Sequence, residues 1–261
     1  MDIENQYGAL KLQTKLLHLL KSFHTFCVNN DIRYSLDWGT LLGAIRHKGF
    51  IPWDDDLDIM VDRENYNKLL RLIKDESELI LDNENLRTYW IGRVRWAKED
   101  GSDIYPPTID VLIVDNAPNN ILSRKIRVLL ILMIQGMLKV YPNFKKGNLL
   151  LRMSTFVTYY MGKLFSRKFK LKMYGWLAQL SNKTDTKQVT SYYEEYNCMG
   201  KYYSRNLLDE VVLVPFEDTM AYVVKDYHKC LTIQFGSNYM TPIKEGLNHT
   251  ERYLKRLNEN D

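Results

Sequence analysis

The sequence predicts an α+β fold with α/β-like character, in which a small mixed sheet is flanked by helices and carries an inserted basic helical segment. Three observations support this class. Helical and strand-like patterns alternate through the first 120 residues, as they do in proteins that pack helices on a sheet. The stretch 121–182 is helical and basic, and a last strand and helix follow it. A chain of 261 residues can bury a sizeable core.

The first elements follow from hydrophobic spacing. Leucine and phenylalanine recur at helical intervals over 6–28, which predicts a helix. "IRYSLDW" (32–38) alternates apolar and polar residues, as a strand does. "GTLLGAIRH" (39–47) reads as a short helix that opens at a Gly-Thr turn, and "DLDIMV" (56–61) as the second strand.

The middle of the chain continues the alternation. Tyr66, Leu69, Leu70 and Ile73 share one face of a helix predicted over 63–76. Two further strands are expected, at "LRTYWIGRVRWAK" (86–98) and "TIDVLIVD" (108–115).

The last part is expected to hold two helical segments, 121–140 and 148–181, then the strand "VVLVPF" (211–216) and a helix over 226–236 that ends at Gly236. No repeat or low-complexity linker interrupts the chain. We therefore expect three parts, namely a core at 1–120, the basic helical insert at 121–182, and a C-terminal part at 183–261 that completes the fold.

Composition excludes several classes of protein. The apolar content of 45% and charged content of 26% are typical of soluble globular chains. Cys27, Cys198 and Cys230 lie far apart, which argues against a disulfide framework or a zinc site. The start shows no secretory signal, and the longest apolar run, 128–138, is shorter than the roughly 20 residues of a membrane span. We expect a cytoplasmic protein.

Charge is concentrated in one region. Residues 121–180 contain twelve Lys or Arg and no Asp or Glu, interleaved with apolar and aromatic residues. This pattern indicates a surface for a membrane or another anionic partner, mainly through 139–172. The alternative is a solvated helix face. No nucleic-acid motif is present, so a nucleic-acid partner is not expected.

Four aspartates, Asp54, Asp55, Asp56 and Asp58, precede the apolar run of the second predicted strand. Their charges repel each other, and burying them costs several kcal/mol each unless a cation neutralises them. Side chains two residues apart on a strand point the same way. We therefore expect Asp56 and Asp58 to act as a pair, with Asp54 and Asp55 at the mouth of the strand.

Asp110 supplies the third carboxylate, because it interrupts an apolar strand that can lie beside 56–61. Three carboxylates suit Mg²⁺ or Mn²⁺, and two such ions can bind both the attacking and the leaving oxygen of an in-line displacement. The sequence thus predicts Asp56, Asp58 and Asp110 as the catalytic and metal-binding residues, with two ions expected. The alternative is an acidic surface turn.

Several residues near the aspartates are candidates for substrate binding. Gly39 and Thr40 open a helix, where backbone N–H groups and a hydroxyl suit a phosphate. Arg46, His47 and Lys48 can bind diphosphate oxygens, or can form a solvated helix end. His47 as general base is less favoured.

Arg93 and Arg95 share one face of a predicted strand and can meet a phosphate or the acceptor, although a surface strand explains them equally well. Trp53 and Trp38 can stack on a base or cover a quaternary ammonium group, or can belong to the core. His249 is a weaker candidate for the border of the site.

These motifs resemble a known family. A Gly-Thr turn, a short helix, Asp-x-Asp and an acid on a later strand resemble the nucleotidyltransferase superfamily. "LDWGTLLGAIRHKGFIPWDDDLDIMV" closely resembles the signature of the LicD family, named for bacterial phosphocholine transfer, and "TIDVLIVD" resembles its third-aspartate strand. The tail "VPFEDTMAYVVKDYHKCLTIQFGSNYMTP" is similar to its closing motif, with Phe235-Gly236-Ser237-Asn238-Tyr239 replacing a Tyr-Gly-Asp-Tyr-like turn.

The resemblance implies a nucleotidyltransferase-like catalytic core and a CDP-linked donor. Phosphocholine, phosphoethanolamine or an aminoethylphosphonate-like group would move to a hydroxyl of a cell-surface glycan or its lipid-linked precursor, as in capsule, teichoic acid or lipopolysaccharide synthesis, and CMP would leave. The enzyme would work in the cytoplasm, peripherally at the inner face of the membrane. The alternatives are a true nucleotidyltransferase that moves an NMP group and a non-catalytic glycan- or membrane-binding module.

Overall fold

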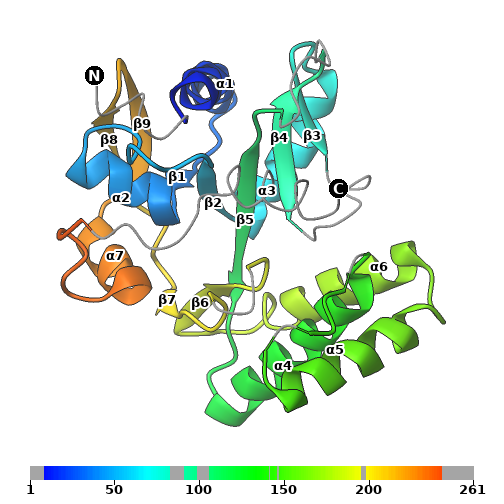
Figure 1. The fold of residues 1–261 in the computed structure, drawn as a ribbon. Helices are drawn as coiled ribbons and strands as arrows, with labels where there is room; N and C mark the ends of the chain where they lie inside the picture. The colour runs from blue at the N-terminus through cyan, green and yellow to red at the C-terminus, as the bar shows by residue number, and fades with distance from the viewer. Residues whose placement is uncertain are drawn as a thin grey trace. The chain divides into compact units, whose positions relative to one another are not determined.

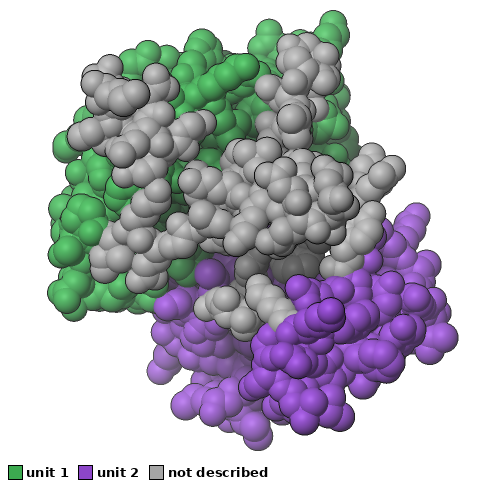
Figure 2. All heavy atoms as spheres, in the orientation of Figure 1, with its two compact units in different colours: residues 1–82, 93–112, 206–261 green, residues 83–92, 113–205 purple. Residues whose placement is uncertain are grey.

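The computed structural model describes residues 9–82, 91–98, 106–140, 142–145, 147–194 and 198–242, and it confirms the α+β fold (Figure 1). The chain divides into two compact units (Figure 2). The first unit combines 1–82, 93–112 and 206–261, and the second combines 83–92 and 113–205. The predicted three-part division stays a prediction.

The main sheet has seven strands among the described residues. Its order is β1-β2-β5-β4-β3, with β6 paired to β5 and β7 to β6. The strands are β1 (Ser35–Leu36), β2 (Asp58–Asp62), β3 (Leu79–Asp82), β4 (Gly92–Trp96), β5 (Ile109–Asn116), β6 (Gln188–Ser191) and β7 (Tyr203–Ser204). The pairs β1–β2, β3–β4 and β5–β6 are antiparallel. Strand β5 therefore begins beside β2 and ends beside β6.

The first unit is built on the apolar face of α1 (Leu10–Asn29). Leu16, Leu19, Leu20 and Phe23 of this helix are buried, at the helical spacing that the sequence predicts. The unit also contains α2 (Trp38–Arg46), α3 (Arg63–Leu72), a 3₁₀ turn η2 (Ile73–Asp75) and α7 (Tyr227–Phe235). The last helix ends at Gly236, whose φ of +88° suits glycine.

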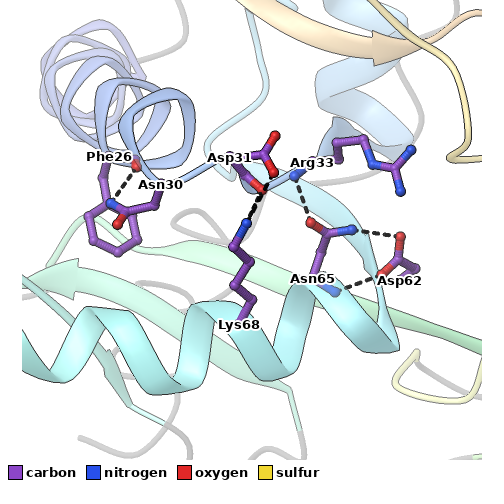
Figure 3. Close-up of polar contacts among 7 residues, drawn as sticks. All are labelled: Phe26, Asn30, Asp31, Arg33, Asp62, Asn65 and Lys68. Carbon is purple, nitrogen blue, oxygen red and sulfur yellow. Dashed lines mark hydrogen bonds and ion pairs between the residues drawn. The ribbon is translucent and has the colours of Figure 1, made fainter.

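The start of α3 is tied to the turn that precedes β1 (Figure 3). The side chain of Asp62 caps α3 by accepting the backbone N–H of Asn65 at 2.7 Å. The Asn65 side chain accepts the backbone N–H of Arg33 at 2.8 Å, and Lys68 donates to the Asp31 carbonyl at 2.6 Å. These contacts fix β2, which ends at Asp62, against the segment leading to β1.

A hairpin of β8 (Val211–Phe216) and β9 (Thr219–Val224) supports the loop after α2. Glu217, at the turn of the hairpin, donates its backbone N–H to the Lys48 carbonyl at 2.7 Å. Its side chain accepts the backbone N–H of Phe50 at 2.8 Å. The loop that leads to the aspartates is therefore anchored on both sides of Gly49.

The second unit contains α4 (Ile121–Leu138), α5 (Leu149–Gly162) and α6 (Arg167–Gln179). A side-chain cap starts each of these helices, supplied by Asn120, Asn148 and Ser166. The single helical segment predicted over 148–181 is wrong in this respect, because it is two helices. The chain stops α5 at Gly162, and the Ser166 cap starts α6 four residues later.

No helix in the described part of the chain is long and apolar enough to cross a membrane.

Some strands differ from the prediction. The strand expected over 56–61 begins at Asp58, and that expected over 32–38 is limited to Ser35–Leu36. Within the range 86–98, β4 covers Gly92–Trp96, while 86–90 lie outside the described residues. The sequence did not predict β3, β6, β7 or β9, which are short segments whose positions depend on a partner strand.

Candidate active site

The site is built where β1 passes into α2. Asp37 connects the two elements, and its backbone N–H donates to the Asp58 carbonyl at 3.0 Å. Its buried carboxylate accepts the backbone N–H of Trp38 at 2.9 Å and the amide of Gln234 at 2.6 Å. Asp37 therefore caps α2 and joins three parts of the fold at one point.

The first turn of α2 brings its backbone close to a carboxylate. Trp38 has a φ of +44°, an uncommon conformation for a residue other than glycine. A Cβ atom added to Gly39 would lie 2.5 Å from Oδ2 of Asp54. Glycine at position 39 permits this close approach, whereas phosphate binding by the Gly-Thr turn stays a prediction.

Thr40 serves the aspartates from the same helix. Its hydroxyl oxygen accepts the backbone N–H of Asp58 at 2.9 Å, and the side chain is buried. The hydroxyl therefore fixes the start of β2. This contact places Thr40 in the site as a support for Asp58, whereas phosphate binding by Thr40 stays a prediction.

Asp110 lies beside this segment on β5. Its backbone N–H donates to the Leu57 carbonyl at 2.9 Å, so β5 lies beside the 56–61 segment, as predicted. Its carboxylate accepts two hydrogen bonds from Arg93, at 2.7 Å from Nε and 3.1 Å from Nη2. Arg93 on β4 thus meets the third aspartate in the bidentate geometry that guanidinium groups favour.

A helix far away in the sequence holds the loop that carries the other aspartates. The amide of Gln13, on α1, donates to the carbonyls of Ile51 at 3.0 Å and Asp54 at 2.7 Å. Gln13 is itself buried. Since a buried amide is costly unless it is hydrogen-bonded, these two bonds define the course of the loop.

The carboxylates affect each other's ionisation. Burial raises the pKa of Asp58 well above its usual value, and the charges of Asp56, Asp110, Asp37 and Asp54 raise it further. Burial also raises the pKa of Asp54 well above its usual value, followed by the charge of Asp56 and a hydrogen bond with it. Burial raises the pKa of Asp37 to about 6. The predicted trio therefore lies within one electrostatic cluster that also includes Asp37 and Asp54.

The chemistry of this cluster fits a hard divalent cation. Its donors are carboxylate oxygens, which Mg²⁺ and Mn²⁺ prefer. Within the described ranges, no group of three or more His, Cys, Asp or Glu side chains is arranged to hold a metal ion as it stands. Arg93 instead holds the carboxylate of Asp110.

The basic residues after α2 have separate positions. The guanidinium of Arg46 donates to the backbone carbonyls of Tyr239 at 2.8 Å and Thr241 at 3.4 Å, so it fastens the turn after α7. Partial burial and the charge of Arg46 lower the pKa of His47, which favours its neutral form. Lys48 is exposed, with a φ of +65°.

The remaining candidates are distributed around the same unit. Arg95 forms an ion pair with Asp82 at 3.7 Å, across the β3–β4 pair, whereas Arg93 reaches Asp110. Trp38 packs edge-on against Phe235, with ring centroids 5.6 Å apart, and Trp53 is partly exposed in the loop before β2. His249 lies outside the described residues.

The comparison with known families identifies the domain. Residues 31–122 match the model described as "LicD/FKTN/FKRP, nucleotidyltransferase domain". The chain carries a LicD-family domain. The match begins just before β1 and extends past β5, so it contains every aspartate of the cluster. The chain that carries this domain is thus an enzyme of the transferase class, as its sequence motifs imply.

Individual relatives agree with this assignment. The chain is 29% identical over 247 residues to the lipopolysaccharide cholinephosphotransferase LicD of Haemophilus influenzae, covering 89% of this chain and 92% of that protein. It is also 41% identical over 69 residues to an uncharacterised protein of Rickettsia prowazekii, with 26% of each chain covered. An uncharacterised protein of Rickettsia typhi is 47% identical over 55 residues, which is 21% of this chain and 18% of that one.

Sequence reasoning missed Asp37, Gln13 and Gln234 as parts of the candidate site. Asp37 directly precedes the Trp-Gly-Thr motif, where an aspartate is a typical N-cap, so a signal for it was present. Gln13 and Gln234 lie on helices far from the motif in sequence, and no local pattern connects them to it.

Proposed function

We propose that the protein transfers a phospho-alcohol group, of the phosphocholine type, from a CDP-linked donor to a hydroxyl of a cell-surface glycan or its lipid-linked precursor, with release of CMP. The observation that carries this proposal is the gathering of Asp56, Asp58 and Asp110 into one cluster within a LicD-family domain. The name of the Haemophilus influenzae relative supports phosphocholine as the group and lipopolysaccharide as the class of acceptor.

In this proposal Asp56, Asp58 and Asp110 hold Mg²⁺ or Mn²⁺, with two ions in the complete site. Such ions, when bound, neutralise the charge of the diphosphate and of the leaving CMP. Asp110 also accepts the proton of the attacking hydroxyl, since it is the carboxylate that Arg93 orients through two hydrogen bonds. The phosphates of the CDP-linked substrate accept hydrogen bonds from Gly39 and Thr40 at the start of α2 and from His47 and Lys48 after it.

The place of action is part of the proposal. A glycan precursor on a lipid carrier is presented at the inner face of the cytoplasmic membrane, so we place the enzyme in the cytoplasm and peripherally on that membrane. The basic helices α4 to α6 support this location, because residues 121–180 contain no acidic side chain.

The proposal is tested with purified protein and a panel of CDP-linked alcohols that contains choline, ethanolamine, glycerol and ribitol. With Mg²⁺ or Mn²⁺ and a glycan acceptor, CMP release is expected for one donor above the others. Asp58→Asn should abolish the release, whereas Asp75→Asn, at an exposed position outside the cluster, should leave it unchanged. If Asp58→Asn released CMP at the wild-type rate, the proposal would be wrong.

A second candidate follows from the description of the matching domain. A true nucleotidyltransferase would use the same aspartates to move an NMP group onto a small molecule or sugar, and would release pyrophosphate. Mass spectrometry of the products separates the two reactions, because one yields CMP and the other pyrophosphate. A non-catalytic glycan- or membrane-binding module would yield neither product with any donor.

A further inference from the structure

Helix α5 has its small and polar residues inside and its large apolar residues outside. Thr155, Thr158 and Gly162 are its buried positions. The opposite face carries large apolar side chains at helical spacing, with Leu150 exposed to 76% and Leu164, just beyond the helix, to 80%. The exposed apolar residues of α5 are Leu149, Leu150, Met153, Phe156, Val157 and Tyr160. This orientation is the reverse of that expected for a surface helix in water.

The buried face of α5 packs closely on α4. A Cβ atom added to Gly136 would lie 2.3 Å from the Thr158 hydroxyl oxygen, and one added to Gly162 would lie 2.4 Å from the Met137 carbonyl oxygen. Lys170, from α6, donates to the carbonyls of Met137 and Gly162 at 2.9 and 3.0 Å, which satisfies the ends of both helices. The small inner residues are thus required for helix contact, which leaves the large apolar residues for the outside.

The neighbouring helices also expose large apolar side chains. Helix α4 packs against both α5 and α6 (Figure 1). Its first half exposes Ile121, Leu122, Ile126 and Leu129. The segment that includes α6 exposes Phe165, Phe169, Leu180 and Trp176, the last to 61%. We call the exposed apolar residues of α4, α5 and α6 the helical surface. Soluble proteins rarely expose so many large apolar side chains together unless the surface binds a partner.

Charge indicates which partner fits this surface. The exposed basic residues of this region include Lys125, Arg152, Lys163, Lys168 and Lys172, and no acidic residue occurs between 121 and 180. The ammonium group of Lys163 lies over the rings of Tyr159 and Tyr160, at 4.8 and 5.0 Å from their centroids. Apolar side chains flanked by lysine and by amphipathic aromatic rings are typical of helices that lie in a membrane interface.

We propose that the helical surface embeds in the headgroup region of an anionic lipid bilayer, with α5 lying in the plane of the membrane. No described helix can cross the bilayer, so this contact is interfacial. A second copy of the chain is a poorer occupant, because it would place like charges against each other across the contact. This inference rests on the membrane location given under the proposed function and names the surface that makes the contact. Lipid binding itself needs no donor, acceptor or metal.

Vesicle flotation with the full chain tests this proposal in the absence of any substrate. We expect the protein to float with vesicles that mix phosphatidylcholine with phosphatidylglycerol. Binding to vesicles of phosphatidylcholine alone should be weaker by about tenfold or more. Added salt should weaken binding to the anionic vesicles. The double variant Leu150→Glu/Val157→Glu should lower binding by about tenfold or more, since it charges the outer face of α5. The double variant Lys168→Glu/Lys172→Glu should lower binding to anionic vesicles by a similar factor and leave binding to phosphatidylcholine vesicles unchanged.

Leu213→Glu is the matched control, because Leu213 on β8 is also exposed, to 48%, and lies outside the helical surface. It should float like the wild type. Adding vesicles to the wild type should shift its tryptophan emission to the blue. Trp176→Phe should remove this shift. Since all these positions are exposed, circular dichroism melts should match the wild type.

The proposal is overturned if the wild-type protein does not float, or if both charge variants float as it does. It is also overturned if the wild type forms a concentration-dependent dimer in solution that Leu150→Glu/Val157→Glu dissociates, because the partner is then a second copy. CMP release with a water-soluble acceptor should be unchanged in Leu150→Glu/Val157→Glu. If the wild-type protein floats with the vesicles but releases no CMP, the lipid contact stands and only the transferase proposal is refuted.

Discussion

Arg93 on β4 donates two hydrogen bonds to the carboxylate of Asp110 on β5, at 2.7 and 3.1 Å. This ion pair fixes the orientation of the Asp110 carboxylate, whose charge acts on Asp58 at the start of β2. Both side chains are about one-fifth exposed, so the pair is shielded from much of the solvent. An arginine in this position also supplies part of the positive charge that five neighbouring carboxylates require.

We expect Arg93→Lys to lower kcat by roughly 10- to 100-fold, because lysine keeps the charge and loses the planar, two-point contact with Asp110. KM for the donor should change less. The measurement is CMP release at saturating metal and donor. Arg95→Lys is the control, because Arg95 faces Asp82 on the same strand pair and should retain nearly full activity. Equal losses in the two variants would contradict a specific role for Arg93.

Asp110→Asn should reduce transfer by roughly 100-fold or more, since it removes the negative charge and the proton acceptor that the proposed mechanism assigns to Asp110. The fold should persist, because the change relieves repulsion within the cluster. The matched variant is Asp115→Asn on the same strand, where the side chain is buried and accepts a hydrogen bond from Asn182. Activity that falls for Asp115→Asn and not for Asp110→Asn would refute the assignment.

Gly39→Ala should impair activity far more than stability. The added methyl group would lie 2.5 Å from Oδ2 of Asp54, and the carboxylate, at the end of a side chain, can move away at small cost to folding. We expect kcat to fall by roughly tenfold or more, because a small misplacement of a catalytic group is costly, with the melting temperature lowered by only a few degrees. Gly175→Ala, where the nearest atom would be 3.7 Å away, should leave both quantities unchanged.

Gln13→Leu should lower both stability and activity. It leaves the carbonyls of Ile51 and Asp54 without their amide donor, which costs roughly 1–3 kcal/mol of unfolding free energy. It should also raise the concentration of Mg²⁺ needed for half-maximal CMP release, because the aspartate loop is less well fixed. Gln179→Leu provides the comparison, since Gln179 is exposed and bonds only within its own helix. An unchanged metal requirement in folded Gln13→Leu would show that the loop does not depend on α1.

His24 should make the protein sensitive to mild acid. Partial burial lowers its pKa in the folded state from 6.5, so the unfolded chain binds a proton more readily. Its contribution to stability is therefore present above about pH 6.5 and is lost as the pH falls through the lower, folded-state pKa. His24→Gln should flatten the dependence of the unfolding midpoint on pH between about 7 and 5, as measured in urea.

The sequence allowed the α+β class and most helices to be predicted because their apolar spacing is regular, as in α1 and α4. The motif around Gly39 and the aspartates also lies within the stretch 31–122 that matches the family model. The parity argument for Asp56 and Asp58 assumed a strand from residue 56, whereas β2 begins at Asp58. Asp56 therefore reaches the cluster from the preceding loop, whose course depends on distant contacts.

Those contacts explain what local patterns cannot predict. Asp54 lies in the loop before β2, where it was expected, but no local pattern indicates that its carboxylate lies close to Gly39 or that Gln13 binds the backbone of its loop. Likewise, no local pattern indicates that the guanidinium of Arg46 fastens the carbonyls of Tyr239 and Thr241, while phosphate binding by Arg46 stays a prediction. Both outcomes depend on residues about 40 or more positions away in sequence.

The bond from Gln13 to the Asp54 carbonyl has a consequence for how small a working version of this protein can be. The stretch recognisable as a LicD-family domain begins at residue 31 and contains all the acids, yet it excludes α1. A fragment cut at that boundary would retain the signature and lose the amide that shapes it. The minimal working unit is therefore larger than the stretch 31–122 that the family model recognises.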